Sequence, residues 1–168
     1  MTKNLDIEGL RLIAANYDLF YIDLWGVVHN GIKLHKQAMG TLKELLKMNK
    51  NLVLLTNAPR PNQTVRVFLE KMGMDEKIRK HVFTSGEASL NYLKKFYPLD
   101  KFFHIGPPRD FDLFNDFKNN QSKDLNESQY LLCTGLFDEH DKELNYYKEL
   151  LKNHIKKKND LYQSRFNS

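Results

Sequence analysis

The chain has 168 residues, of which 41% are hydrophobic and 28% are charged, and its formal net charge is +5. This length suits one domain, or one and a partial second, and the composition is that of a globular protein. No apolar run approaches the roughly 20 residues of a membrane span, and the N-terminus lacks the apolar core of a signal peptide. We therefore expect a cytoplasmic protein without a membrane partner.

The cysteine and lysine content limits the possible partners further. Cys133 is the only cysteine, which excludes an internal disulfide and a cysteine-cluster metal site, and its apolar neighbours favour a small buried side chain. Much of the excess positive charge lies in 152–158 and has no aromatic stripe beside it. This pattern favours a solvated helix end over a nucleic-acid surface, so we expect no nucleic-acid partner.

The apolar positions predict an alternation of helices and strands. The expected order is a helix over 5–15, a strand over 18–24, a helix over 36–49, a strand over 52–55, a helix over 62–73, a strand over 81–86, a helix over 86–95, a strand over 101–105, a short helix over 112–117, a polar loop over 118–128, a strand over 129–135 and a last helix over 143–151. The run at 52–55 is continuously apolar, as in parallel strands that are covered on both faces. The alternation therefore predicts an α/β fold with a parallel sheet.

The most informative stretch is 18–31, where an apolar strand ends at Asp23 and continues into a loop that contains glycines. In open α/β sheets, ligands bind outside the carboxyl ends of the strands, so a carboxylate at this position can react with a substrate. An aspartate can attack phosphorus as a nucleophile. Thr56 and Asn57, at the end of the strand expected beside it, could bind the phosphoryl oxygens, and Mg²⁺ could neutralise their charge.

Each candidate residue also has a purely structural interpretation. Asp23 could start a turn or cap a helix, and Thr56 with Asn57 could form only a turn before two prolines. Arg60 could hold an anion or face solvent. The histidines show no helical metal-ligand spacing, which favours surface or core roles over ligation. Glycines in the loop after Asp23, Gly26 and Gly31 among them, would serve backbone geometry at positive φ in either case.

Several motifs together resemble the haloacid dehalogenase superfamily of aspartate-nucleophile hydrolases. Tyr21-Ile22-Asp23-Leu24-Trp25-Gly26-Val27 matches the first family motif at all but one position, and Leu52-Val53-Leu54-Leu55-Thr56-Asn57 matches the second. The stretches Trp25-Gly26-Val27-Val28-His29-Asn30-Gly31, Thr56-Asn57-Ala58-Pro59-Arg60 and Phe83-Thr84-Ser85-Gly86-Glu87-Ala88 resemble subfamily IIA more narrowly, the group of p-nitrophenyl-, pyridoxal- and sugar-phosphate phosphatases.

The resemblance implies a Rossmann-like three-layer core with an inserted α/β cap. It assigns 1–90 to the N-terminal part of the core and 91–155 to part of the cap, and leaves 156–168 as an irregular tail. It implies that Asp23 is the nucleophile and a Mg²⁺ ligand, that the backbone carbonyl of Trp25 is a second ligand, and that Thr56 and Asn57 bind phosphate. The implied activity is Mg²⁺-dependent hydrolysis of a small phosphorylated metabolite.

Two departures from the family pattern weaken this expectation of activity. The position two residues after Asp23, normally a second aspartate that transfers protons, is Trp25, and the loss of a general acid or base costs about 10²–10⁴-fold in rate. The family's later lysine and acidic motifs lie beyond the cap, where this sequence has ended. We therefore expect a C-terminally truncated hydrolase that is weak or inactive alone.

The alternatives are an inactive gene remnant, or an anion-binding or interaction fragment that self-associates or needs a separate C-terminal half. One set of A/T-rich codons for 159–168, read one base later, encodes Met-Ile-Cys-Ile-Asn-Pro-Asp-Leu-Ile. Family members return from cap to core with a segment of this kind, so a frameshift near the codons for 156–158 is a hypothesis that the DNA sequence tests.

Overall fold

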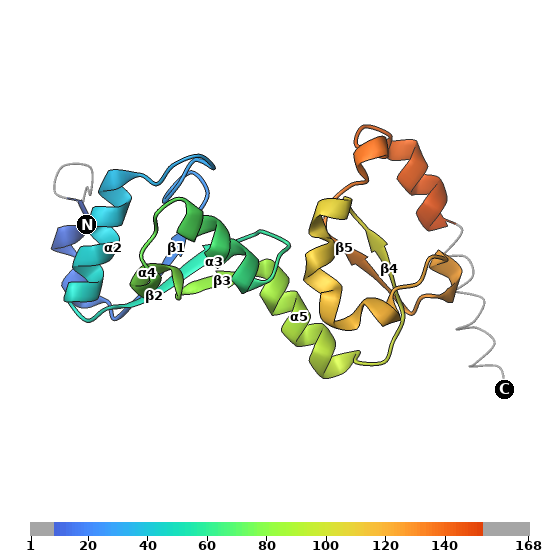
Figure 1. The fold of residues 1–168 in the computed structure, drawn as a ribbon, viewed down its shortest axis with the longest axis horizontal. Coiled ribbons are helices and arrows are strands. Elements are labelled where there is room, and N and C mark those ends of the chain that lie inside the picture. The colour runs from blue at the N-terminus through green and yellow to red at the C-terminus, as the bar shows by residue number, and fades with distance from the viewer. Residues whose placement is uncertain (1–8, 153–168) are drawn as a thin grey trace. The chain divides into compact units, whose positions relative to one another are not determined.

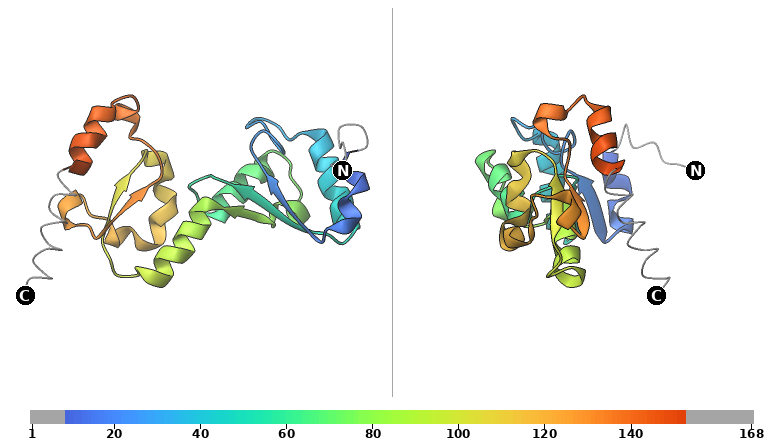
Figure 2. Two further views of the ribbon diagram at one scale, coloured as in Figure 1. Left: turned by 180° about the vertical axis from the view of Figure 1, so that it is seen from behind. Right: turned by 90° about the vertical axis from the view of Figure 1, so that its right-hand side faces the viewer.

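The computed structural model describes residues 9–152, and the chain divides into two compact units, Met1–Leu90 and Asn91–Ser168. Figures 1 and 2 show the helices and strands of each unit. The expected tail over 156–168, with its hypothetical frameshift, lies outside the described residues, as do residues 5–8 of the first expected helix. The assignment of the two units as core and cap stays a prediction.

The first unit is built on a three-stranded parallel sheet (Figure 1). Its strands are β1 (Leu19–Asp23), β2 (Asn51–Thr56) and β3 (Val82–Thr84), in the order β1-β2-β3. Asp23 is in register with Leu55, and Thr56 with Thr84. The strands therefore end side by side, at the edge where open α/β sheets bind ligands.

Helices pack on one face of this sheet. They are α2 (Lys36–Lys47), α3 (Asn62–Lys71) and the short α4 (Glu76–Arg79), and α5 (Ser85–Phe96) follows β3 directly. The core between helices and sheet contains Ala14, Leu24, Val28, Leu42, Leu45, Leu52, Leu54, Val65, Leu69, Met74, Ile78 and Val82. The buried residues of β2 alternate along the strand, and apolar residues recur at helical spacing in α2 and α3, which accounts for this core.

The other face of the sheet carries apolar side chains that the described residues leave exposed. Tyr21 in β1 is 66% exposed and Phe83 in β3 is 39% exposed, and Leu19 and Leu55 also face solvent. They alternate with buried or half-buried positions of the same strands, because successive side chains in a strand point to opposite faces.

The second unit has a separate two-stranded parallel sheet, β4 (Phe102–Ile105) and β5 (Tyr130–Cys133). Its core is aromatic: the fully buried Phe102 contacts the rings of Phe114, Phe117 and Tyr130. The segment Pro108–Asn120 between the strands is 3₁₀-helical with kinks, and a helical segment covers 144–152.

The α/β fold with parallel sheets confirms the fold class predicted from the sequence. Two local predictions were wrong, and one short helix was missed. The helix expected over 5–15 is instead two short 3₁₀ helices, Gly9–Leu12 and Ala14–Asn16, within the described residues, and α4 was not predicted. Cys133 is exposed rather than buried, because Leu132 occupies the inward position of β5 and the next side chain points to the opposite face. No helix among residues 9–152 is long and apolar enough to span a membrane.

Candidate active site at the ends of β1 and β2

Asp23 is placed by the pairing of β1 with β2. The backbone N–H of Leu24 donates to the Leu55 carbonyl at 3.1 Å and to Oδ1 of Asp23 at 2.9 Å, which orients the carboxylate at the end of the strand. Leu24 is buried while Asp23 is exposed. A rigid backbone thus presents an accessible carboxylate beside the end of β2.

The loop after Asp23 folds back on itself, and its Val28 and His29 side chains are buried. Val28 N–H donates to the Leu24 carbonyl at 2.9 Å, and Gly26 N–H donates to the His29 carbonyl at 2.8 Å. Gly26 and Gly31 have φ angles of 78° and 88°, which side chains other than glycine rarely adopt. The loop therefore has one defined backbone path.

Trp25 occupies the position at which the resemblance implied a proton-transferring aspartate. Its side chain is 63% exposed and meets the His29 ring edge-on, with 5.5 Å between ring centroids. A Cβ atom added at Gly31 would lie 2.6 Å from Cη2 of Trp25, so the indole occupies space that only glycine leaves open. Because an indole has no acidic group, this side chain cannot protonate a leaving group.

The loop that carries Thr56, Asn57 and Arg60 is fastened to the start of α5. Oγ1 of Thr84, a buried side chain, donates to the Arg60 carbonyl at 2.5 Å. The Ala58 carbonyl accepts from Oγ of Ser85 and from N–H of Gly86, each at 3.1 Å. These bonds fix the backbone just after the end of β2.

A second set of bonds connects this loop to the first turn of α3. Oδ1 of Asn62 accepts from Thr84 N–H at 2.9 Å, and Oε2 of Glu87 accepts from Asn62 N–H at 2.9 Å. Glu87 N–H in turn donates to Oγ1 of Thr84 at 2.9 Å. Thr84, Gly86 and Glu87 belong to a stretch that resembles subfamily IIA, but the sequence indicates no role for them, because only the fold brings them to the loop.

A cavity of about 360 Å³ lies beside the ends of the two strands. It is lined by Leu24, Trp25, His29, Thr56, Ala58, Arg60, Thr64, Val65 and Phe68. Of the residues predicted for the site, Trp25, Thr56 and Arg60 meet here, whereas Asp23 and the exposed Asn57 are not part of the lining. His29 and Phe68 were not predicted as site residues. Phe68 is far from Trp25 and His29 in the sequence, so no sequence pattern indicated that these side chains line one cavity.

His29 is buried between Trp25 and Phe68, and its ring centroid is 5.8 Å from that of Phe68. Burial lowers the pKa of His29 and the nearby His35 lowers it further, while the negative charge of Asp23 opposes both effects. Nδ1 of His29 lies 3.0 Å from the N–H of Gly31 and accepts its hydrogen bond. The hydrogen bond fits the neutral ring with its proton on Nε2.

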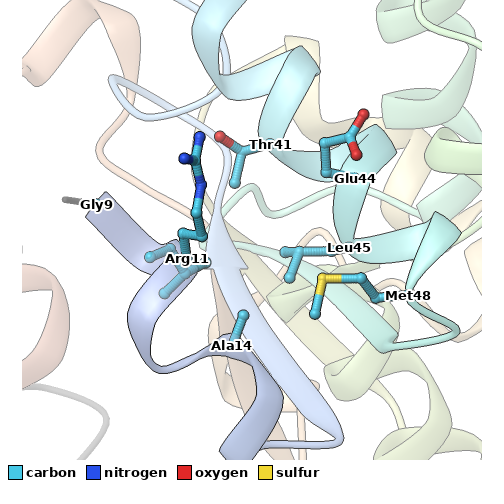
Figure 3. A pocket seen from close by; sticks show the side chains of 8 residues that line it. Gly9, Arg11, Ala14, Thr41, Glu44, Leu45 and Met48 are labelled. Carbon is cyan, nitrogen blue, oxygen red and sulfur yellow. The ribbon is translucent and has the colours of Figure 1, made fainter.

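A larger cavity, of about 440 Å³, lies against α2 and the segment before β1 (Figure 3). Arg11, Thr41 and Glu44 contribute its polar side chains, and Ala14, Leu45 and Met48 contribute apolar ones. None of the predicted site residues lines this cavity, so it is separate from the ends of the strands.

The metal site implied by the resemblance needs several donor atoms close together. Among residues 9–152, no group of three or more histidine, cysteine, aspartate or glutamate side chains could hold a metal ion. Asp23 and the backbone carbonyl of Trp25 remain as the donors that the resemblance implies. One carboxylate and one carbonyl do not fit a complete Mg²⁺ site by themselves.

Comparison with known proteins gives a family match over more than half of the chain. The model of haloacid dehalogenase-like hydrolases matches residues 20–118. A solved haloacid dehalogenase-like hydrolase from Brucella suis is 29% identical, with a TM-score of 0.72 over 86% of this chain and 54% of its own. A 4-nitrophenylphosphatase from Thermotoga maritima is 25% identical, with a TM-score of 0.61 over 84% of this chain and 51% of its own.

A glycerol phosphate phosphatase from Mycobacterium tuberculosis, solved in complex with magnesium, shares the fold at 20% identity. Its TM-score is 0.57 over 74% of this chain and 38% of its own. No curated protein is significantly similar in sequence. The chain thus spans about half the length, or less, of these solved structures.

Proposed function

The chain belongs to the family of haloacid dehalogenase-like hydrolases, and from this premise we propose that it carries the nucleophile and phosphoryl-binding half of a phosphatase that acts on a small phosphorylated metabolite. The observation that carries the proposal is the register of β1 with β2, which places the exposed Asp23 carboxylate next to the Thr56 loop. The phosphatases among its structural relatives support the same reaction class.

In the proposed reaction, an oxygen of the Asp23 carboxylate attacks phosphorus as the bond from phosphorus to the leaving oxygen breaks. The Thr56 hydroxyl and the Asn57 backbone N–H donate hydrogen bonds to the phosphoryl oxygens, and the Arg60 side chain adds positive charge at the cavity. Water then hydrolyses the aspartyl phosphate and releases inorganic phosphate.

The proposed turnover by these residues alone is slow. Trp25 has no acidic proton to give to the leaving oxygen, which therefore departs as an anion and takes its proton from water. The absence of a general acid costs about 10²–10⁴-fold in rate. A second candidate function, anion binding without turnover, is favoured by the same Trp25 side chain.

Mg²⁺ is the cation we propose for this site, since the family resemblance implies it and a structural relative was solved with it. The residues proposed here as its ligands are Asp23 and, through its carbonyl, Trp25. Because these donors do not fit a complete site, no step of the proposed reaction depends on the metal.

The remaining proposals concern location and partners. We propose the cytoplasm, the compartment of small phosphorylated metabolites. For the exposed sheet face around Tyr21 and Phe83, we propose a polypeptide partner, because parallel sheets are ordinarily covered on both faces. A second half of the family's fold suits this face, since the matched structures are about twice as long.

The experiment that tests the proposed function measures phosphate release from p-nitrophenyl phosphate with added Mg²⁺, and binding of inorganic phosphate by calorimetry. We expect slow release that Asp23→Asn abolishes, and phosphate binding that Thr56→Val weakens by about tenfold through the loss of a hydrogen bond to a charged group. Thr41→Val is the matched control and should change neither value, because Thr41 is an exposed residue of α2 that lines the separate 440 Å³ cavity and none of the site at the strand ends.

The two candidate functions give different results in this experiment. Binding of phosphate without Asp23-dependent release would favour the anion-binding function over hydrolysis. Absence of both binding and release would contradict the phosphoryl site itself.

A further inference from the structure

The side chains around the 360 Å³ cavity are mainly aromatic and aliphatic. Trp25 and Phe68 remain 63% and 42% exposed there, and the buried His29 joins the two rings through edge-on contacts. Leu24 and Val65 add aliphatic surface. Exposed aromatic side chains that converge on one concavity are suited to a planar apolar group, which they contact with ring faces and edges.

Trp25, His29 and Phe68 form one aromatic wall of the cavity, and contacts with their surroundings hold this wall in place. The Trp25 indole packs over Gly31, where an added Cβ atom would be 2.8 Å from Cζ3, and His29 is fixed by the hydrogen bond from Gly31 N–H. Phe68 projects from α3, whose neighbouring Val65 and Leu69 are buried in the core. A wall that is rigid before binding loses little conformational entropy when a ligand arrives.

Two polar residues of the same cavity lie at the end of β2 and in the loop after it, and a third, Thr64, lies on α3. Thr56 and Arg60 line the cavity together with the aromatic side chains. A ligand that is anionic at one end and planar at the other could therefore contact both sets of residues at once.

The lack of a general acid at position 25 also favours a ligand with an aromatic leaving group. Without an acid at position 25, the leaving oxygen must depart as an anion, which is far easier for a phenol, with a pKa of about 10 as in tyrosine, than for an aliphatic alcohol. Loss of the acid therefore penalises alkyl phosphates more than aryl phosphates.

We propose that the cavity between Trp25, His29 and Phe68 is a subsite for the aromatic leaving group of an aryl phosphate monoester. The inference rests on the proposed function, because the phosphoryl group must occupy the loop beside Asp23 for the ring to reach the cavity. Trp25 thereby acts as a binding wall for the leaving group in place of a proton donor.

The test uses the full chain and two phosphonates that resist hydrolysis, phenylphosphonate and methylphosphonate. Trp25 is the only tryptophan, so its fluorescence reports directly on the cavity, and calorimetry gives both dissociation constants. We expect phenylphosphonate to quench or shift the emission and to bind at least about tenfold more tightly than methylphosphonate, because the ring buries apolar surface.

Two variants locate the ring within the molecule. Phe68→Leu should abolish most of the preference for phenylphosphonate while leaving the affinity for methylphosphonate unchanged. Phe83→Leu is the matched control, since Phe83 is similarly exposed, at 39%, but lies on the sheet strand β3 and outside the cavity lining. It should leave the preference intact.

The outcomes separate this inference from the function on which it rests. Equal affinities for the two phosphonates would overturn the aromatic subsite and leave the phosphoryl site standing. A preference that survives Phe68→Leu would also overturn it, because the ring would then bind elsewhere. If neither phosphonate binds, the phosphoryl site fails and the subsite fails with it.

Discussion

At the scale of single residues, Trp25 and Gly31 have complementary shapes. The indole of Trp25 lies where a Cβ atom at position 31 would be, and Gly31 has a φ of 88°. Gly31 therefore satisfies two separate demands, one from the backbone and one from the ring. Gly26, with a φ of 78° and no atom within 4 Å of an added Cβ, satisfies only the first.

This difference makes a prediction for alanine at each glycine. Gly26→Ala should lower the free energy of unfolding by about 1–2 kcal/mol, the cost of a left-handed backbone for a residue with a side chain. Gly31→Ala should cost at least about 1 kcal/mol more, because the methyl group overpacks the loop and displaces the indole. Urea unfolding measures both values.

The emission spectrum of Trp25 provides the second measurement on these variants. It should change in Gly31→Ala and stay as in the parent chain in Gly26→Ala, since only the first variant moves the ring. Equal losses of stability with unchanged spectra would show that the ring does not depend on Gly31.

At the scale of elements, the start of α5 fixes the path of the loop between β2 and α3. An added Cβ atom at Gly86 would lie 2.5 Å from the Arg60 carbonyl oxygen, so the helix and the loop backbone are in direct contact. Thr84 and Ser85 bond to the same loop. The position of Thr56 and Arg60 in the cavity thus depends on an element more than 20 residues later in the chain.

Two glycines in helices allow a matched test of this contact. Gly86→Ala should destabilise the protein and weaken phosphate binding, because the loop backbone must move away from the methyl group. Gly40→Ala in α2, with no atom within 4 Å of its added Cβ, should instead stabilise it by about 0.5–1 kcal/mol through better helix propensity. Unfolding midpoints and phosphate calorimetry measure both effects, and stabilisation of Gly86→Ala would contradict the contact.

The sequence predicts the elements better than the contacts between them. Short apolar runs were enough to locate β1 and β2, and apolar residues at helical spacing were enough to locate α2 and α3, because burial imposes these patterns. They could not predict that the Thr84 side chain bonds to the Arg60 carbonyl or that Trp25 lies over Gly31. Such contacts depend on tertiary distances, which leave no period in the sequence.

At the scale of the whole molecule, each of the two units contains a histidine whose pKa is lowered, the half-buried His81 in the first and the buried His104 in the second. Burial lowers the pKa of His81 in the first unit, and the charge of Lys80 lowers it further, as Arg66 does to a smaller extent; hydrogen bonds with the backbone of Leu52 and Lys77 oppose these effects. Burial also lowers the pKa of His104 in the second unit, and Asp110 partly opposes it. Both shifts have the same sign, so both units should respond to acid in the same direction.

The resulting prediction is that the protein loses stability as the pH falls from 7.5 to 5.5. In this range the unfolded chain, with histidine pKa values near 6.5, takes up protons before the folded chain does, so protonation favours unfolding. The free energy of unfolding should fall by at most about 1.4 kcal/mol per pH unit for each histidine. Urea titrations across this range measure this dependence of the free energy of unfolding on pH.

The variant His104→Asn should make that dependence weaker. The variant also loses the 2.8 Å contact between Nε2 of His104 and Oγ1 of Thr134, but this loss lowers the free energy of unfolding at every pH and does not change its slope. A stability that is constant or rises toward pH 5.5 would contradict the lowered pKa values.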